Sequence, residues 1–236
     1  RMHNLGGAFG EALRLIVGLD GDLVEIVGLS LRVSLCAVLL AALIGFPLGA
    51  AVAVARFPGR GALVAALNTF MGLPPVVVGL VIYVLLSRAG PLGELGLLYT
   101  PTAMIAAQTV LVTPIVAALT RQTVEDLRGE YEEQLHAFGV GAPGLVATLL
   151  WEARLSLVTV LLAGFGRAVA EVGAVIIVGG NINHVTRVMT TAIALETSKG
   201  DLELALGLGI VLLTIVLAIN GLASGLRSAV AQASHA

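Results

Sequence analysis

The sequence predicts an all-α, polytopic membrane protein, with about five core spans in a transmembrane helical bundle plus short interfacial and cytoplasmic coupling helices. The chain is 58% hydrophobic and 12% charged, with a mean hydropathy of +1.01, which is too little charge for a soluble domain of 236 residues. Its apolar residues also form continuous runs that reach the roughly 20 residues needed to cross a bilayer. A membrane β-barrel would instead show short alternating segments.

The chain divides into three predicted regions. Residues 1–22 mix apolar and charged side chains, and we expect them to form an amphipathic helix lying on the membrane surface. Residues 23–228 form the membrane domain, and residues 229–236 form a C-terminal tail. Acidic residues, not basic ones, precede the first apolar run, so no cleavable signal peptide is expected.

Five apolar runs are long enough to be spans. They cover approximately residues 24–54, 62–86, 101–120, 155–178 and 202–226. In the first run, Gly45 and Gly49 have the small-xxx-small spacing that permits close approach of two helices. Residues 188–195 are too few to cross a membrane, and they predict a short helix at its surface.

Polar and helix-breaking residues inside these runs indicate spans that face the interior of the bundle. Pro74 and Pro75 interrupt the second run, and the freed backbone groups need protein or water as partners. Arg167 and Glu171 in the fourth run are four residues apart, which predicts a pair on one helix face. A structural kink and a structural ion pair are the alternatives to a transport role. The candidate pathway residues are Asn68, Thr69, Pro74, Pro75, Arg167, Glu171 and Asn181.

Residues 121–154, here called the polar segment, are the longest charged stretch of the chain. Gly139 and Gly141 are expected to end its first helix, and Pro143 to begin a second. Apolar residues recur along the first helix at helical spacing and predict one packed face: Leu127, Tyr131, Leu135 and Phe138. Arginines are more frequent on this side of the spans than in the opposite loops, which predicts that the polar segment faces the cytoplasm.

Several chemistries are excluded by the residues present. The single lysine, Lys199, follows no glycine-rich phosphate-binding loop, so the chain is not expected to hydrolyse a nucleotide itself. Paired cysteines and a metal-binding HExxH pattern are absent, and His136 and His184 are predicted to be isolated surface histidines. We therefore expect no catalytic residue, cofactor or metal. The net charge of −2 gives no sign of a nucleic-acid partner.

The polar segment resembles the cytoplasmic loop of type I ATP-binding-cassette importer permeases, whose motif is Glu-Ala-Ala, three residues, Gly, nine residues and Ile-x-Leu-Pro. Glu133 lies six residues before Gly139, and Leu149 lies ten residues after it, as this spacing requires. The departures from the motif are Gln134 and Leu135 in place of the alanines, and Trp151 and Glu152 in place of Leu-Pro.

Three further stretches look like the oxyanion permeases of this family. Residues 71–96 are similar to their Leu-Pro-Pro segment, and residues 166–181 are similar to their fourth span. Residues 186–201 are most similar to the tungstate branch. The resemblance covers about residues 24–226 and implies a permease for a small oxyanion, most similar to those for tungstate, with molybdate, sulfate or another anion as alternatives.

The resemblance also implies partners and a location. A homodimer in the prokaryotic inner membrane would bind two cytoplasmic ABC ATPase subunits, and a periplasmic or lipid-anchored protein would deliver the oxyanion. The residues implied to contact or support the ATPase are Glu132, Glu133, His136, Ala137, Phe138, Gly139 and Leu149. Two readings compete with this one: a free-standing secondary transporter that uses Arg167 and Glu171 as an ion-coupled pair, and a structural membrane scaffold.

Overall fold

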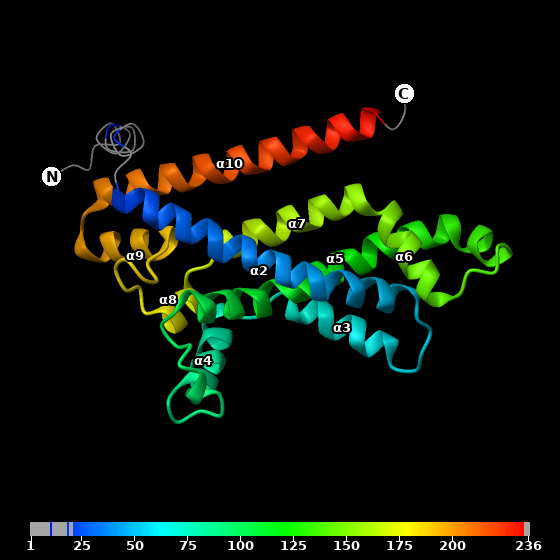
Figure 1. Ribbon diagram of the computed structural model, residues 1–236, viewed down its shortest axis with the longest axis horizontal. Coiled ribbons are helices and arrows are strands. Elements are labelled where there is room, and N and C mark those ends of the chain that lie inside the picture. The colour runs from blue at the N-terminus through cyan, green and yellow to red at the C-terminus, as the bar shows by residue number, and fades with distance from the viewer. Residues whose placement is uncertain (1–9, 11–17, 19–20, 234–236) are drawn as a thin grey trace. The chain divides into compact units, whose positions relative to one another are not determined.

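The computed structural model describes residues 21–233 together with Gly10 and Gly18, and every regular element in this part of the chain is helical (Figure 1). Most of the predicted interfacial segment, residues 1–22, therefore lies outside the described residues. The elements are α2 (Gly21–Val54), α3 (Arg60–Phe70), α4 (Pro75–Leu86), η1 (Gly93–Leu95), α5 (Pro101–Ala137), α6 (Ala142–Glu152), α7 (Arg154–Val169), α8 (Gly173–Gly179), α9 (Met189–Lys199) and α10 (Leu202–Ala233).

Three described helices are long and apolar enough to cross a membrane by themselves, within Gly21–Val54, Pro101–Tyr131 and Leu202–Gly225. Two broken pairs, α3 with α4 and α6 with α7, pass the same test when each is taken together, which gives up to five spans. The predicted all-α membrane fold is confirmed. The break between α3 and α4 falls at the double proline, because Pro75 can begin a helix but cannot continue one.

The prediction of one continuous helix over residues 155–178 is wrong. Helix α7 ends at Val169 and α8 begins at Gly173, so Arg167 and Glu171 do not share one helix face. Glu171 lies in the break with 3% of its surface exposed, and its Oε1 accepts the Ala174 N–H at 3.0 Å. Its carboxylate thus satisfies one of the orphan N–H groups that begin α8, which stabilises the break.

Two helices continue beyond the predicted ends of their spans. The third span was expected to end near Thr120, but α5 runs without interruption into the polar segment. Residues 115–128 contain neither glycine nor proline, so nothing in this stretch stops the helix. At the other end of the chain, α10 continues to Ala233, through part of the predicted tail.

The chain forms two compact units. The first contains the described residues within Arg1–Cys36, Pro75–Gln108 and Val169–Leu222. In it, α4 and α8 touch through their backbones, since a Cβ atom on Gly79 would lie 2.8 Å from the Cα of Ala174. The apolar core of this unit joins the start of α2 to α9 and α10, through Leu23, Met189, Ala192, Leu208 and Val211.

Polar contacts also hold the first unit together. The Ser30 hydroxyl accepts the Met189 N–H at 2.8 Å, at the start of α9. His184 lies 2.8 Å from the Glu25 carboxylate, so the predicted isolation of this exposed histidine is wrong. The hydrogen bond and negative charge of Glu25 raise the pKa of His184 above its ordinary value.

The second unit contains Ala37–Pro74, Thr109–Ala168 and the described residues that follow Leu222. Here the predicted glycine contact is confirmed, because Gly45 and Gly49 of α2 face α5. A Cβ atom on Gly45 would lie 2.8 Å from the Val116 side chain, and one on Gly49 would collide with the carbonyl oxygen of Ala117. The helices therefore approach more closely than any larger residue would allow.

Replacing Gly49 by alanine tests this contact. The obstacle is backbone and cannot rotate away, so we expect Gly49→Ala to lower the free energy of unfolding by about 1–3 kcal/mol. The matched control is Gly28→Ala in the same helix, where a Cβ atom would meet nothing within 4 Å. Thermal unfolding in detergent measures both variants, and equal midpoints would contradict the close approach.

Candidate coupling site

The polar segment is built around a turn that only glycine adopts easily. Helix α5 ends at Ala137, and Gly139 follows with φ of +71°. A Cβ atom at Gly139 would have nothing within 4 Å, so lack of space does not require glycine here. The left-handed backbone conformation does. Gly141 then precedes α6, which carries Pro143 in its first turn. The predicted helix end and helix start are both confirmed.

Beneath this turn, apolar side chains join α5 and α6 to the end of α2. The buried residues of this cluster are Ala50, Ala53, Val54, Val124, Leu145 and Leu149. Leu127 and Tyr131 of the predicted apolar face pack against it, whereas the side chain of Leu135 lies outside the described residues. Leu149 has no exposed surface, so it supports the segment from beneath and contacts no partner in this arrangement.

The end of α2 is held by arginine side chains from two other helices. Arg128 of α5 donates through Nη1 to the carbonyl oxygens of Ala53 at 2.8 Å and Val54 at 3.0 Å. Arg60 of α3 donates through Nε to the carbonyl oxygen of Val52 at 2.8 Å. These carbonyls have no partner within the helix, and the negative end of the helix dipole favours cations there.

A carboxylate links the two arginine-bearing helices. Glu125 of α5 accepts hydrogen bonds from Arg60 of α3 and from Arg121 one turn earlier in α5. These charged groups were not predicted as site residues. The Arg121–Glu125 spacing of four residues could have suggested that pair. The Arg60–Glu125 pair spans 65 residues of sequence and carries no such signal.

The tip of the polar segment is exposed. Phe138 exposes 83% of its surface and Trp151 exposes 67%, and the Arg154 guanidinium lies 5.1 Å from the centre of the Trp151 ring. Of the other predicted coupling residues, Glu133, Ala137 and Gly139 are exposed. The side chains of Glu132 and His136 lie outside the described residues. Exposed aromatic side chains of this size are typical of contact surfaces.

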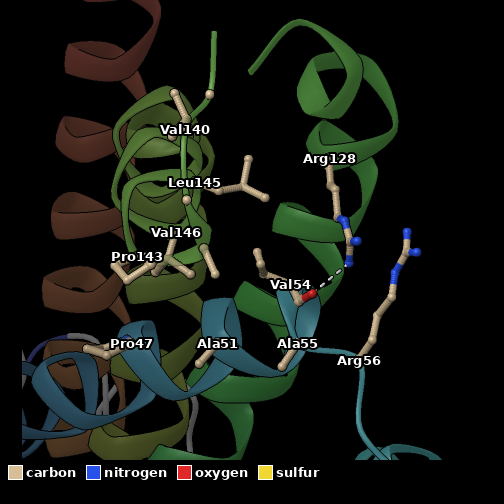
Figure 2. A pocket seen from close by; sticks show the side chains of 13 residues that line it. Pro47, Ala51, Val54, Ala55, Arg56, Arg128, Val140, Pro143, Leu145 and Val146 are labelled. Carbon is tan, nitrogen blue, oxygen red and sulfur yellow. Dashed lines mark hydrogen bonds between the residues drawn. The ribbon is translucent and has the colours of Figure 1, made fainter. Parts of the chain in front are cut away.

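A groove of about 920 Å³ lies between the end of α2 and the turn that precedes α6 (Figure 2). Its described lining is mainly apolar, with arginines from α5 and from the residues after α2. The lining residues are Pro47, Ala51, Val54, Ala55, Arg56, Arg128, Gly139, Val140, Gly141, Ala142, Pro143, Leu145 and Val146.

The predicted pathway residues are divided between the two units. Asn68 and Thr69 are exposed on α3 in the second unit, which also contains Pro74 and Arg167; the first unit contains Pro75, Glu171 and Asn181. Within the first unit, Pro75 and Glu171 lie close together on either side of Gly173. A Cβ atom on Gly173 would lie 3.6 Å from the Pro75 Cβ and 3.5 Å from the Glu171 Oε1. Asn181 follows the opposite end of α8, where its amide donates to the Thr191 carbonyl at 3.4 Å.

Buried polar side chains surround Glu171. They line a cavity of about 10 Å³ formed in part by Ser30, Ser34, Gln108 and Thr190. Thr190 donates its hydroxyl to the Glu171 carbonyl at 2.8 Å. A cavity of this size holds one water molecule at most, so it is not an oxyanion site in this conformation.

The candidate spans define an integral membrane protein with an exposed polar segment. Comparison with known families then assigns the chain: it belongs to the binding-protein-dependent transport system inner membrane components, which it matches over residues 45–233. The resemblance to importer permeases is thereby confirmed.

Individual relatives are similar over most of the chain. A probable anion ABC transporter permease of Haloferax volcanii is 42% identical, covering 87% of this chain and 90% of the relative. The tungstate uptake system permease of Peptoclostridium acidaminophilum is 40% identical, covering 96% and 99%. A sulfate transport system permease of Escherichia coli is 30% identical, covering 72% and 65%.

Arg128 can be tested through its contact with α2. Arg128→Gln should lower the free energy of unfolding by about 1.5–3 kcal/mol, because charged hydrogen bonds to the carbonyls of Ala53 and Val54 are lost. Hydrogen exchange should quicken around residues 50–60. Arg154→Gln is the control, since Arg154 is exposed and its described contacts are with the nearby Trp151 and Glu152. Equal unfolding of both variants would show that the α2 contact contributes nothing.

Proposed function

We propose that this chain is the membrane-spanning permease subunit of an ATP-binding-cassette importer that carries tungstate. One observation supports the substrate above all others: the similarity to a tungstate uptake permease at 40% identity extends over 96% of the chain. The similarity to a sulfate permease is lower, at 30% over 72%. Molybdate and sulfate are therefore the alternative cargoes.

In this proposal the chain acts as a homodimer with two cytoplasmic ATPase subunits and an extracytoplasmic oxyanion-binding protein. The polar segment faces the cytoplasm and meets the ATPase through its exposed tip. Phe138 and Glu133 offer an apolar and a charged contact, while Ala137 and Gly139 shape the turn. We assign Glu132 and His136 to the same surface on their sequence position alone.

The packing of the second unit explains how movement at the tip would reach the membrane. Helix α5 continues from the third span to Ala137, a length of about 55 Å at the rise of an α-helix. Leu145 and Leu149 fix α6 to the end of α2, and Arg128 fixes α5 to the same place. ATP-driven closure of the two ATPase subunits would therefore move these helices as a body.

The anion pathway is proposed to pass the interrupted spans. Helices α4 and α8 both begin inside runs that the sequence predicts as spans, and their first turns meet near Gly173. Helix starts carry partial positive charge, and transporters of other folds direct such interrupted helices at anionic substrates. Glu171 lies at this meeting point and is assigned a structural role, since its carboxylate and carbonyl oxygens both accept hydrogen bonds within the unit.

Uptake by the reconstituted transporter tests the substrate. The chain is placed in proteoliposomes with its ATPase and its oxyanion-binding protein, and tungstate, molybdate and sulfate uptake are measured with and without ATP. Tungstate uptake should require ATP and exceed that of the other anions. Preferred uptake of molybdate or sulfate would identify that anion as the substrate in place of tungstate. Anion uptake by this chain alone, driven by an ion gradient, would favour the secondary transporter.

Gly139→Val tests the coupling role of the turn. A β-branched residue at φ of +71° introduces about 1–2 kcal/mol of strain. If the strain falls on the docked state, stimulation of the ATPase by the loaded binding protein falls roughly tenfold. Gly129→Val is the control, because Gly129 is exposed inside α5 and its Cβ position is also open. Unchanged stimulation in Gly139→Val, with normal membrane insertion, would remove the turn from the coupling surface.

A further inference from the structure

The two large exposed aromatic side chains of the polar segment lie at different distances from the end of α2. In α5, Val124 packs against Ala50 and Val54 of that end. Helix α5 then continues for thirteen residues to Ala137, which is about 20 Å at the rise of an α-helix. Phe138 follows directly. The exposed Phe138 ring is therefore carried well past the contact between α5 and α2.

Trp151, in contrast, lies close to that contact. Leu149 of α6 belongs to the same buried cluster as the end of α2 and has no exposed surface. Trp151 follows two residues later, and residues two apart in a helix point to different sides of it. This explains why Trp151 exposes 67% of its surface although α6 itself packs against α2.

The neighbouring helices place Trp151 at the edge of the membrane. Helix α2 is long and apolar enough to cross a bilayer and ends at Val54, whereas α7 begins at Arg154. Helices α6 and α7 meet in a bend of 74°, and Ala153 at this corner is only 1% exposed (Figure 1). The apolar run of the fourth span begins at Leu155. Trp151 thus lies where one span ends and another begins.

The groups exposed at this corner have the chemistry of a bilayer interface. An indole combines an apolar body with an N–H donor, and tryptophan is enriched where acyl chains meet headgroups. The Arg154 guanidinium lies 5.1 Å from the centre of the Trp151 ring and 4.0 Å from the Glu152 carboxylate. Arginines at the ends of spans keep their apolar stems beside the hydrocarbon and their charge among the headgroups. The corner therefore presents an apolar surface with a polar edge.

We propose that Trp151 inserts into the headgroup region of the bilayer at the corner between α6 and α7. This region is about 5–8 Å deep on each side of a membrane, so a side chain about 20 Å farther along α5 lies beyond it. The polar segment then has two contact surfaces, with lipid at Trp151 and the ATPase at the turn that contains Phe138. The insertion rests on the membrane location of the spans; only the choice of the cytoplasmic leaflet rests on the proposed function.

Fluorescence tests the insertion without a label, because Trp151 is the single tryptophan of the chain. The full chain is reconstituted in phosphatidylcholine liposomes in which part of the lipid carries bromine atoms close to the headgroup. Bromine quenches an indole only at close contact. We expect about twofold quenching by this lipid, weaker quenching by lipid brominated near the ends of its chains, and little quenching by iodide in the water.

The matched control moves the tryptophan to the turn. Phe138→Trp combined with Trp151→Phe leaves one indole, on the residue that follows α5. We expect iodide to quench this indole and brominated lipid to leave it unchanged. Added ATPase subunits should protect the control from iodide and leave the Trp151 signal as it was. The emission of the ATPase itself is subtracted with a transporter that carries Trp151→Phe alone.

Three outcomes would overturn the proposal. Quenching of Trp151 by iodide and not by brominated lipid would place its ring in water. Protection of Trp151 from iodide only after the ATPase is added would make it a docking contact. Resistance to both quenchers in the chain alone would show that a second copy covers the ring. Failure of the ATPase to protect the control would instead count against the proposed docking at the turn, and the lipid contact would stand.

Discussion

The structure of the second unit depends on how the last turn of α2 satisfies its backbone carbonyls. A helix that ends at a membrane surface leaves its final C=O groups without partners inside the helix, and burial makes an unsatisfied group costly. Arg60 and Arg128 donate to these groups from α3 and α5. Glu125 then links Arg60 to α5. One local requirement of the first span thus fixes the positions of two other helices.

Close packing reinforces the same arrangement. Gly45 and Gly49, within the last three turns of α2, allow α5 to pack closely against that helix. Leu145 and Leu149 pack α6 against the end of α2. Helices α2, α5 and α6 together form a packed base. The side chains of Phe138 and Trp151 are exposed outside this base. Under the proposed function, a close-packed base below an exposed tip would transmit a movement of the tip to the membrane helices.

The features that could be predicted from the sequence are those governed by local backbone chemistry. The double proline, the turn at Gly139 and the start of α6 at Pro143 follow from residues whose conformational limits apply in any context. The break before α8 could not be read in this way. Spacing places Arg167 and Glu171 on one helix face, but the helix breaks between them, and the buried Glu171 carboxylate accepts the Ala174 N–H at the start of a new helix. The contacts of Arg128 with α2 span 74 and 75 residues, so no sequence periodicity predicts them.

The location of Glu171 also bears on how an oxyanion passes. The polar cavity beside it holds one water molecule at most, and the described hydrogen bonds of Glu171 and Thr190 are made within the unit. On the proposed pathway, a doubly charged anion the size of tungstate would therefore need a different conformation in which the region around α4 and α8 opens. Because α4 and α8 meet through Gly79 and Ala174 with no side chain between them, they are best moved as one body. Under the proposed function, selectivity for the anion would belong to the binding protein that delivers it.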